Sequence, residues 1–285
     1  MQKPVNPLPG NAIWKHFKGP GASAHFYHAN GFPLGVYGPF LTQLSRKFNL
    51  SALEWRATWP GMNKPPQTRD WRIYADDLIA FIEEHCITPI IGIGHSMGAT
   101  CTVLAAEKRP DLFKALVLIE PAMVSRPAAF IVRFIPEFMM NLFEPAKSTL
   151  KKPDYWPSRT AYLHYCKNVK AYRRFNDKAY EAMARHGVTE TMPGRFQLAF
   201  PKDWEAHNYT MPPNILGNLK RLSIPCVAVR GNPSLFFTDA MWRKWRKSCP
   251  GVVFRENTRY GHLLPLENPD ACADLIISGL EDLLR

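Results

Sequence analysis

Residues 89–98 read PIIGIGHSMG, and this stretch decides the fold because an apolar run ends in two glycines that flank a serine. Gly94 and Gly98 stand two residues before and two residues after Ser96, which indicates that the backbone doubles back tightly at the serine. Residues 97–109, which follow at once, have the pattern of a helix. A strand, a sharp turn and a helix in succession are the context in which a G-x-S-x-G sequence exposes a nucleophilic serine.

Strands and helices alternate along much of the rest of the chain. Apolar runs predict strands within residues 23–32, 48–55, 89–95, 114–121, 224–231 and 251–257. Helical patterns follow several of them, at residues 71–86, 97–109, 238–250 and 270–285. This alternation is typical of a mostly parallel central sheet that helices flank on both faces, so the predicted fold class is α/β.

The pattern changes between residues 122 and 219, a segment rich in aromatic residues and methionine with no convincing strand. Residues 128–143 and 158–175 resemble amphipathic helices. We therefore expect an α/β core of residues 1–121 and 220–285, interrupted by a helical cap of residues 122–219. The apolar side chains of the cap fit either a pocket for an apolar group or the cap's own core; they include Phe130, Phe134, Phe138, Met139, Met140 and Phe143.

The composition argues against several classes of protein. No run approaches the roughly 18 apolar residues of a membrane-spanning helix, so we expect no stable membrane insertion. The N-terminus lacks the pattern of a secretory signal, and the six cysteines form no CxxC pair, which favours a reduced cytoplasmic protein without a zinc site. The net charge of +12 is dispersed and accompanies no nucleic-acid-binding motif, so nucleic acid is not an expected partner.

A serine hydroxyl needs a base to become a nucleophile near neutral pH. Of the nine histidines, His262 lies in the loop between the last predicted strand and the last predicted helix. That loop belongs to the same edge of the sheet as Ser96, which makes His262 the candidate base. His95 is adjacent to Ser96 in the sequence, but the bend is expected to direct its side chain away from the hydroxyl.

With these motifs the sequence resembles the α/β-hydrolase fold family, in the branch that opens with an HANGFP-like motif. The resemblance implies an α/β-hydrolase fold with a helical cap, Ser96 as nucleophile, His262 as base, and no metal or organic cofactor. The matching stretches are HANGFPLGVYGPF (residues 28–40), GHSMG (94–98), KALVLIEP (114–121), VAVRGNPSLF (227–236) and YGHLLPLENP (260–269).

The acid of the catalytic triad has two candidates. Members of the family usually carry the triad aspartate at the position of Leu235, so this chain lacks an acid at the usual place. Relatives such as haloalkane dehalogenases place the acid after the strand that follows the nucleophile helix, where this chain has Glu120. A buried acid there needs a partner such as the Nδ1–H of His262. We take Glu120 as the acid; Asp239 is the runner-up, although it also fits the first turn of a helix capped by Thr238.

An oxyanion needs two backbone N–H donors in a preformed pocket. Met97, which follows the nucleophile, offers one, and the resemblance implies that Phe32 in the HANGFP loop offers the other. His28 and Asn30 in that loop are candidates for contact with substrate or for bracing the loop. Other candidates for substrate contact are Trp59 in the Pro/Gly-rich loop and, in the cap, Trp204 and Glu205.

These residues predict a serine hydrolase that cleaves a small-molecule carboxylic ester or thioester with an apolar acyl or aryl group. Two other uses of the same site stay open, cofactor-free perhydrolysis and hydrolysis of a C–C bond. A third alternative, from another class, is an inactive ligand-binding protein, which the loss of the usual acid at Leu235 weakly favours. Both a monomer and a homodimer agree with the sequence.

Overall fold

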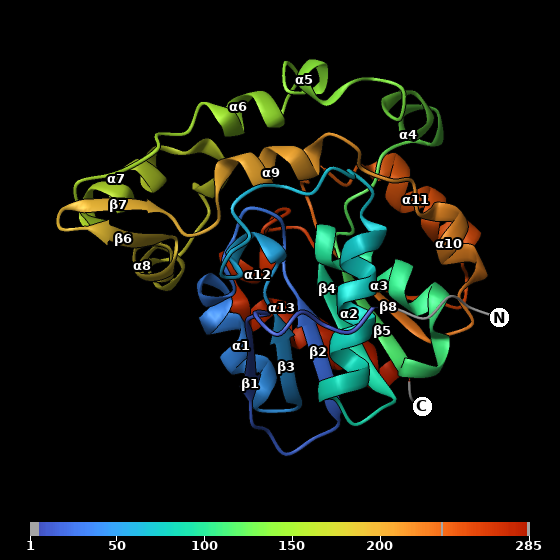
Figure 1. The fold of residues 1–285 in the computed structure, drawn as a ribbon. Coiled ribbons are helices and arrows are strands. Elements are labelled where there is room, and N and C mark those ends of the chain that lie inside the picture. The colour runs from blue at the N-terminus through green and yellow to red at the C-terminus, as the bar shows by residue number, and fades with distance from the viewer. Residues whose placement is uncertain (1–5, 235, 284–285) are drawn as a thin grey trace.

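The computed structural model describes residues 6–234 and 236–283, which fold around a central sheet flanked by helices (Figure 1). In these residues the sheet has seven strands in the order β1-β3-β2-β4-β5-β8-β9. Only β1 runs antiparallel to its neighbour, so the predicted α/β fold class is confirmed. The strands are β1 (Trp14–Phe17), β2 (Ser23–Tyr27), β3 (Asn49–Leu53), β4 (Ile90–His95), β5 (Phe113–Ile119), β8 (Cys226–Gly231) and β9 (Val253–Asn257).

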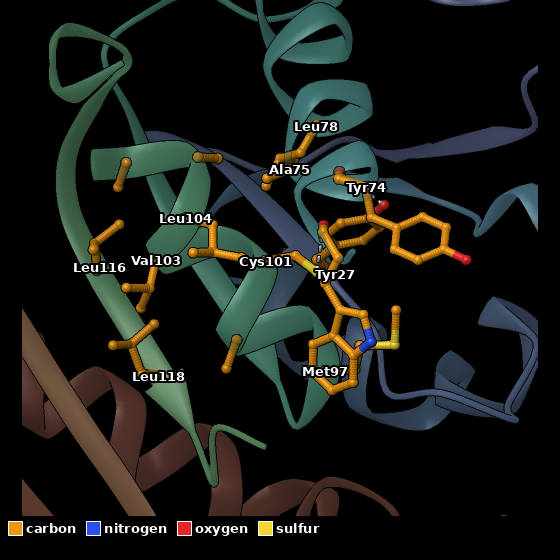
Figure 2. Close-up of a cluster of buried hydrophobic side chains, with 14 of the residues drawn as sticks. Tyr27, Tyr74, Ala75, Leu78, Met97, Cys101, Val103, Leu104, Leu116 and Leu118 are labelled. Atoms are coloured by element: carbon orange, nitrogen blue, oxygen red, sulfur yellow. Dashed lines mark hydrogen bonds between the residues drawn. The ribbon is translucent and has the colours of Figure 1, made fainter. Parts of the chain in front are cut away.

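Each face of the sheet carries its own apolar core, because successive side chains of a strand point to opposite faces. On β5, Leu116 and Leu118 enter one core with Leu104 of α3 (Met97–Lys108), as Figure 2 shows. Val117 and Ile119 enter the other core. The first core also contains side chains of α2 (Arg72–His85), α10 (Leu216–Arg221) and α11 (Asp239–Ser248); the second contains those of α1 (Gly38–Ser45), α12 (Leu264–Glu267) and α13 (Pro269–Leu283).

Most of the segment between β5 and β8 arches over the edge of the sheet at which these parallel strands end (Figure 1). Besides α10, its helices are α4 (Arg126–Val132), α5 (Glu137–Met140), α6 (Ala146–Leu150), α7 (Arg159–Asn168), α8 (Asp177–His186) and α9 (Lys202–Tyr209). Short 3-10 helices lie here and elsewhere, at Leu34–Tyr37, Arg56–Thr58, Pro110–Leu112 and Lys170–Tyr172. The division into a core and a cap of residues 122–219 stays a prediction.

Two details differ from the expectations. The segment contains a β-hairpin, β6 (Val188–Met192) with β7 (Arg195–Leu198), although the sequence analysis found no convincing strand there. These strands are mostly polar and largely exposed or half-buried, so they lack the apolar signal of a sheet core. The expected amphipathic helix of residues 128–143 is two short helices, because Pro136 interrupts it as the N-cap of α5.

The six cysteines are free thiols, in agreement with a chain without disulfides. Among the described residues, no helix combines the length and the apolar character that crossing a bilayer requires.

Candidate active site

The turn after β4 forces Ser96 into a backbone conformation that residues with a side chain rarely adopt, with φ of 54° and ψ of −119°. The flanking glycines make this bend possible. A Cβ on Gly94 would lie 2.4 Å from the Cα of Ala99, and a Cβ on Gly98 would lie 2.0 Å from the carbonyl oxygen of Tyr27. The serine therefore sits between the end of β4 and the first turn of α3, as the G-x-S-x-G sequence predicts.

His262 contacts both other members of the predicted triad. Its Nε2 lies 3.0 Å from the Oγ of Ser96, and its Nδ1 lies 2.8 Å from the Oε2 of Glu120. Since a carboxylate only accepts hydrogen bonds, Nδ1–H donates to Glu120. This tautomer leaves the lone pair of Nε2 free to accept the hydroxyl proton of Ser96.

The carboxylate of Glu120 is fully buried and held by further donors. Its Oε1 accepts the N–H of Gly231 at 2.8 Å, and its Oε2 also accepts the hydroxyl of Ser234. These hydrogen bonds offset the cost of removing a charged group from water. Ser234 was not among the predicted site residues, although it directly precedes Leu235, the position at which members of the family usually carry the acid.

Asp239, the runner-up acid, makes its contacts away from His262 and Ser96. It begins α11, its carboxylate pairs with Arg230, and its side chain is 58% exposed. The hydroxyl of Thr238 accepts the N–H of Met241 at 3.3 Å, so the capped helix start predicted for this stretch is present. Leu235 falls outside the described residues.

A chain of hydrogen bonds links the HANGFP loop to the backbone of His262 through His95. The N–H of Ala29 donates to the Oη of Tyr37 (3.3 Å), and Tyr37 donates to the Nδ1 of His95 (2.7 Å). The Nε2–H of His95 donates in turn to the carbonyl oxygen of His262 (2.9 Å). Burial, together with the nearby His262, lowers the pKa of His95 to about 3, so His95 stays neutral and keeps this pattern.

The sequence predicts that the side chain of His95 points away from the hydroxyl of Ser96, but it does not predict this chain of hydrogen bonds. Tyr37 lies in the HANGFPLGVYGPF stretch, yet nothing in its spacing shows that its hydroxyl meets His95. Phe236 was also missed. Its half-exposed ring packs against the imidazole of His262, with ring centroids 4.7 Å apart.

The HANGFP loop lies against the start of α3, because Gly98 approaches the carbonyl groups of Tyr27 and His28. Within the loop Gly31 has a positive φ of 81°, and a Cβ there would lie 2.5 Å from the carboxyl carbon of Glu205. Phe32 follows directly and is buried. The structure thus brings the Phe32 loop and Met97, the first residue of α3, to the same edge of the sheet as Ser96.

Glu205 and Asn30 connect this loop to the segment above it. The amide of Asn30 donates to the backbone oxygen of Glu205 (2.9 Å) and accepts from Asn208 (2.9 Å). The buried carboxylate of Glu205 pairs with Lys152 and accepts the hydroxyl of Thr149 at 3.4 Å. The side chain of Asn30 therefore ties the loop to α9, and contact of Asn30 or Glu205 with substrate stays a prediction.

The other candidates for substrate contact are buried. His28 donates from Nδ1 to the backbone oxygen of Ala29 at 3.1 Å, and its Nε2 lies 3.4 Å from the carboxylate of Glu54. The indole of Trp59 donates to the backbone oxygen of Glu54 at 3.0 Å. Trp204 belongs to the core on the α2–α3 face. These positions are those of packing residues, and a role in binding stays a prediction for each.

A model described as the alpha/beta hydrolase family matches residues 19–275. The chain therefore belongs to the α/β-hydrolase family. This confirms the resemblance found in the sequence.

The relatives of the chain include two curated proteins that match over part of their length. It is 34% identical over 104 residues to the 2-(acetamidomethylene)succinate hydrolase of Mesorhizobium japonicum, covering 36% of this chain and 37% of that protein. It is 29% identical over 147 residues to the type I acyl-CoA thioesterase mpaH of Penicillium roqueforti, covering 47% of this chain and 33% of that protein. The match thus spans 37% of the length of the first relative and 33% of the length of the second.

Several solved structures match nearly all of the chain. The crystal structure of E-2-(acetamidomethylene)succinate hydrolase has a TM-score of 0.77, with 20% sequence identity, and the match covers 95% of this chain and 99% of that one. At this identity the likeness shows the fold.

Proposed function

We propose that the chain is a serine hydrolase that cleaves a carboxylic ester or thioester through an acyl-enzyme on Ser96. The observation that carries this proposal is the pair of hydrogen bonds that join His262 to Ser96 at 3.0 Å and to Glu120 at 2.8 Å. A hydroxyl, an imidazole and a carboxylate in this order are the parts of nucleophilic catalysis by serine.

In the first half of the reaction the Oγ of Ser96 attacks the substrate carbonyl, and the Nε2 of His262 takes the hydroxyl proton. Glu120 keeps the imidazole in the correct tautomer and stabilises the imidazolium that forms. His262 then gives the proton to the departing alkoxide or thiolate, which leaves the acyl group on Ser96. In the second half water attacks the acyl group, with His262 as base, and the free acid leaves.

The negative oxygen of each tetrahedral intermediate accepts hydrogen bonds from the N–H groups of Met97 and Phe32. Two close approaches support this pair of donors. Gly98 lets the nucleophile turn approach the start of the HANGFP loop, and Gly31 lets that loop approach Glu205. The loss of one such donor costs about 2.7–4 kcal/mol of transition-state stabilisation.

Two observations bear on the substrate, one on the bond that is cleaved and one on the acyl group. The relatives named above include a hydrolase and an acyl-CoA thioesterase, and both ester and thioester cleavage need the three groups that meet at Ser96. The Phe236 ring beside His262 gives the site an apolar wall suited to an acyl or aryl group.

The proposal is tested with p-nitrophenyl esters of increasing chain length and with acyl-CoA thioesters. We expect turnover of at least one of these substrates and a fall in kcat of about 10³-fold or more in Ser96→Ala. Ser278→Ala is the matched control, since Ser278 is an exposed serine on α13. Equal rates in Ser96→Ala and wild type would contradict the mechanism, and binding of esters without any turnover would favour the ligand-binding alternative.

A further inference from the structure

The segment from α4 to the start of α6 exposes an unusual concentration of large apolar side chains. In a soluble protein such residues normally lie in the core, and large exposed clusters mark interaction sites. We call this cluster the α4–α5 surface; its members are 43 to 71% exposed and comprise Phe130, Ile131, Phe134, Phe138, Met139, Leu142 and Phe143. The sequence analysis expected several of these residues in a pocket or in the cap's core, and their exposure excludes the core.

The segment is anchored from its inner side, so its apolar side chains face outward. Asn214 donates to the backbone oxygen of Val124 ahead of α4, and the Nδ1 of His207 on α9 lies 2.9 Å from the carboxylate of Glu137 on α5. In addition to these contacts, the rings of Phe130 and Phe134 pack edge to face against each other, with ring centroids 5.2 Å apart. Figure 1 places α4 and α5 on the outer rim of the molecule.

Exposed cations surround the apolar side chains. Arg126 and Arg133 belong to α4 and its C-cap, and Lys147 and Lys151 belong to α6 and its C-cap. The same stretch holds only two carboxylates, Glu137, which bonds His207, and Glu144, which accepts the N–H of Ser148 at 3.2 Å, so the four cations outnumber them. The chain as a whole carries a net charge of +12. The partner of this surface should therefore be apolar and anionic at once.

We propose that the α4–α5 surface docks reversibly on an anionic lipid surface, with its aromatic side chains among the acyl chains and its cations on the phosphates. Interfacial segments combine apolar residues with Lys and Arg in this way. A second copy of the chain is a less suitable partner, because a two-fold contact would place the cations of one copy against the same cations of the other. Fluid lipid also adapts to the irregular surface that two short helices and their connecting turn present.

Docking in this way brings the candidate active site to the lipid side of the molecule. Ser96 and Glu120 directly follow β4 and β5, and α4 begins a few residues after Glu120, so the α4–α5 surface lies at the same edge of the sheet. The inference itself does not depend on the proposed function, since lipid binding is measured without turnover.

The test uses the full chain and sedimentation with vesicles of phosphatidylcholine alone or mixed with phosphatidylglycerol. We expect binding to the anionic vesicles that weakens in high salt, and a fall of about tenfold in the partition coefficient for the double variant Phe134→Ser, Phe138→Ser. The double variant Arg133→Gln, Lys147→Gln should lose a similar factor. Ile87→Ser is the control, because Ile87 is 81% exposed but precedes β4, at the opposite edge of the sheet. Circular dichroism and thermal unfolding check that each variant folds.

Three results would overturn the proposal. One is no binding to anionic vesicles. Another is binding that the Phe134→Ser, Phe138→Ser variant leaves unchanged, which would indicate adsorption by charge alone. The third is a homodimer in analytical ultracentrifugation that the same variant dissociates while vesicle binding stays at the wild-type level, since the surface would then be covered by a second copy.

Discussion

Ser96 and Glu120 directly follow the neighbouring parallel strands β4 and β5, and both have a positive φ, 54° and 47°. Their main chains are joined on both sides, because Ser96 donates its N–H to Ile119 (2.9 Å) and accepts the N–H of Ala122 (3.1 Å). Such a conformation costs about 1–3 kcal/mol per residue and persists only where the surroundings enforce it. The two strained residues are thus fixed relative to each other, and His262 bridges their side chains.

The first prediction separates the two candidate acids. Glu120→Gln should lower kcat by about 10³- to 10⁴-fold, because the amide no longer holds His262 in the tautomer that accepts the serine proton. Asp239→Asn should stay within about twofold of wild type, since the partner of Asp239 is Arg230. Each variant removes one carboxylate charge, so each serves as the other's control in the same ester assay. A large loss in Asp239→Asn alone would reverse the assignment.

A second prediction concerns the hydrogen-bond chain through His95. Tyr37→Phe removes the donor to the Nδ1 of His95 and so weakens the support of the His262 backbone. We expect kcat to fall about tenfold with KM within about twofold, the loss of one buried hydrogen bond in positioning. Tyr180→Phe, which removes a hydroxyl bonded to the backbone of Tyr172, is the control for stability. Equal kcat values in the two variants would argue against a positioning role.

A third prediction compares two glycines that have the same positive φ. Gly31 and Gly61 both have φ of 81°, but a Cβ on Gly31 would meet Glu205, whereas nothing lies within 4 Å of a Cβ on Gly61. Gly61→Ala should destabilise the fold by about 1 kcal/mol in urea unfolding because of its positive φ, and Gly31→Ala should destabilise it more because its Cβ also meets Glu205. Only Gly31→Ala should also lower kcat, by about 10²-fold or more, because it displaces the loop that carries the Phe32 N–H. Full activity of Gly31→Ala would remove this loop from the mechanism.

The fourth prediction is a loss of stability in acid. Burial, with a contribution from His28, lowers the pKa of His25 to about 3, from 6.5 in the unfolded chain. Between these pH values the unfolded state binds a proton that the folded state does not. Stability therefore falls as the pH falls from 6.5 to 3, by about 1.4 kcal/mol per pH unit for this histidine. In urea unfolding at pH 4, 5 and 6, His25→Gln should show a slope smaller by that amount; a slope equal to that of wild type would contradict it.

The sequence predicts the central part of the site because strand ends are readable from local patterns. The apolar runs before Ser96, Glu120 and the His262 loop place all three at one edge of a parallel sheet, and the structure brings their side chains into contact. The link from Tyr37 through His95 depends on residues that meet only in the folded chain. Local patterns do not contain it.

The segment between β5 and β8 shows the same limit in a different way. Its apolar residues have helical spacing, but spacing does not tell whether Phe134 or Phe138 has anything to pack against, and both are 71% exposed. The polar β6–β7 hairpin lacks an apolar face and so gave no signal for a strand.

The most direct test of the central claim is to trap the nucleophile with a p-nitrophenyl alkylphosphonate. Ser96 should attack phosphorus and expel one p-nitrophenolate per chain, and mass spectrometry should find a single adduct on the peptide that contains Ser96. Ser96→Ala should give neither the release nor the adduct, and Glu120→Gln should give both much more slowly. Stoichiometric release from Ser96→Ala, or an adduct on another residue of the wild-type chain, would contradict the account.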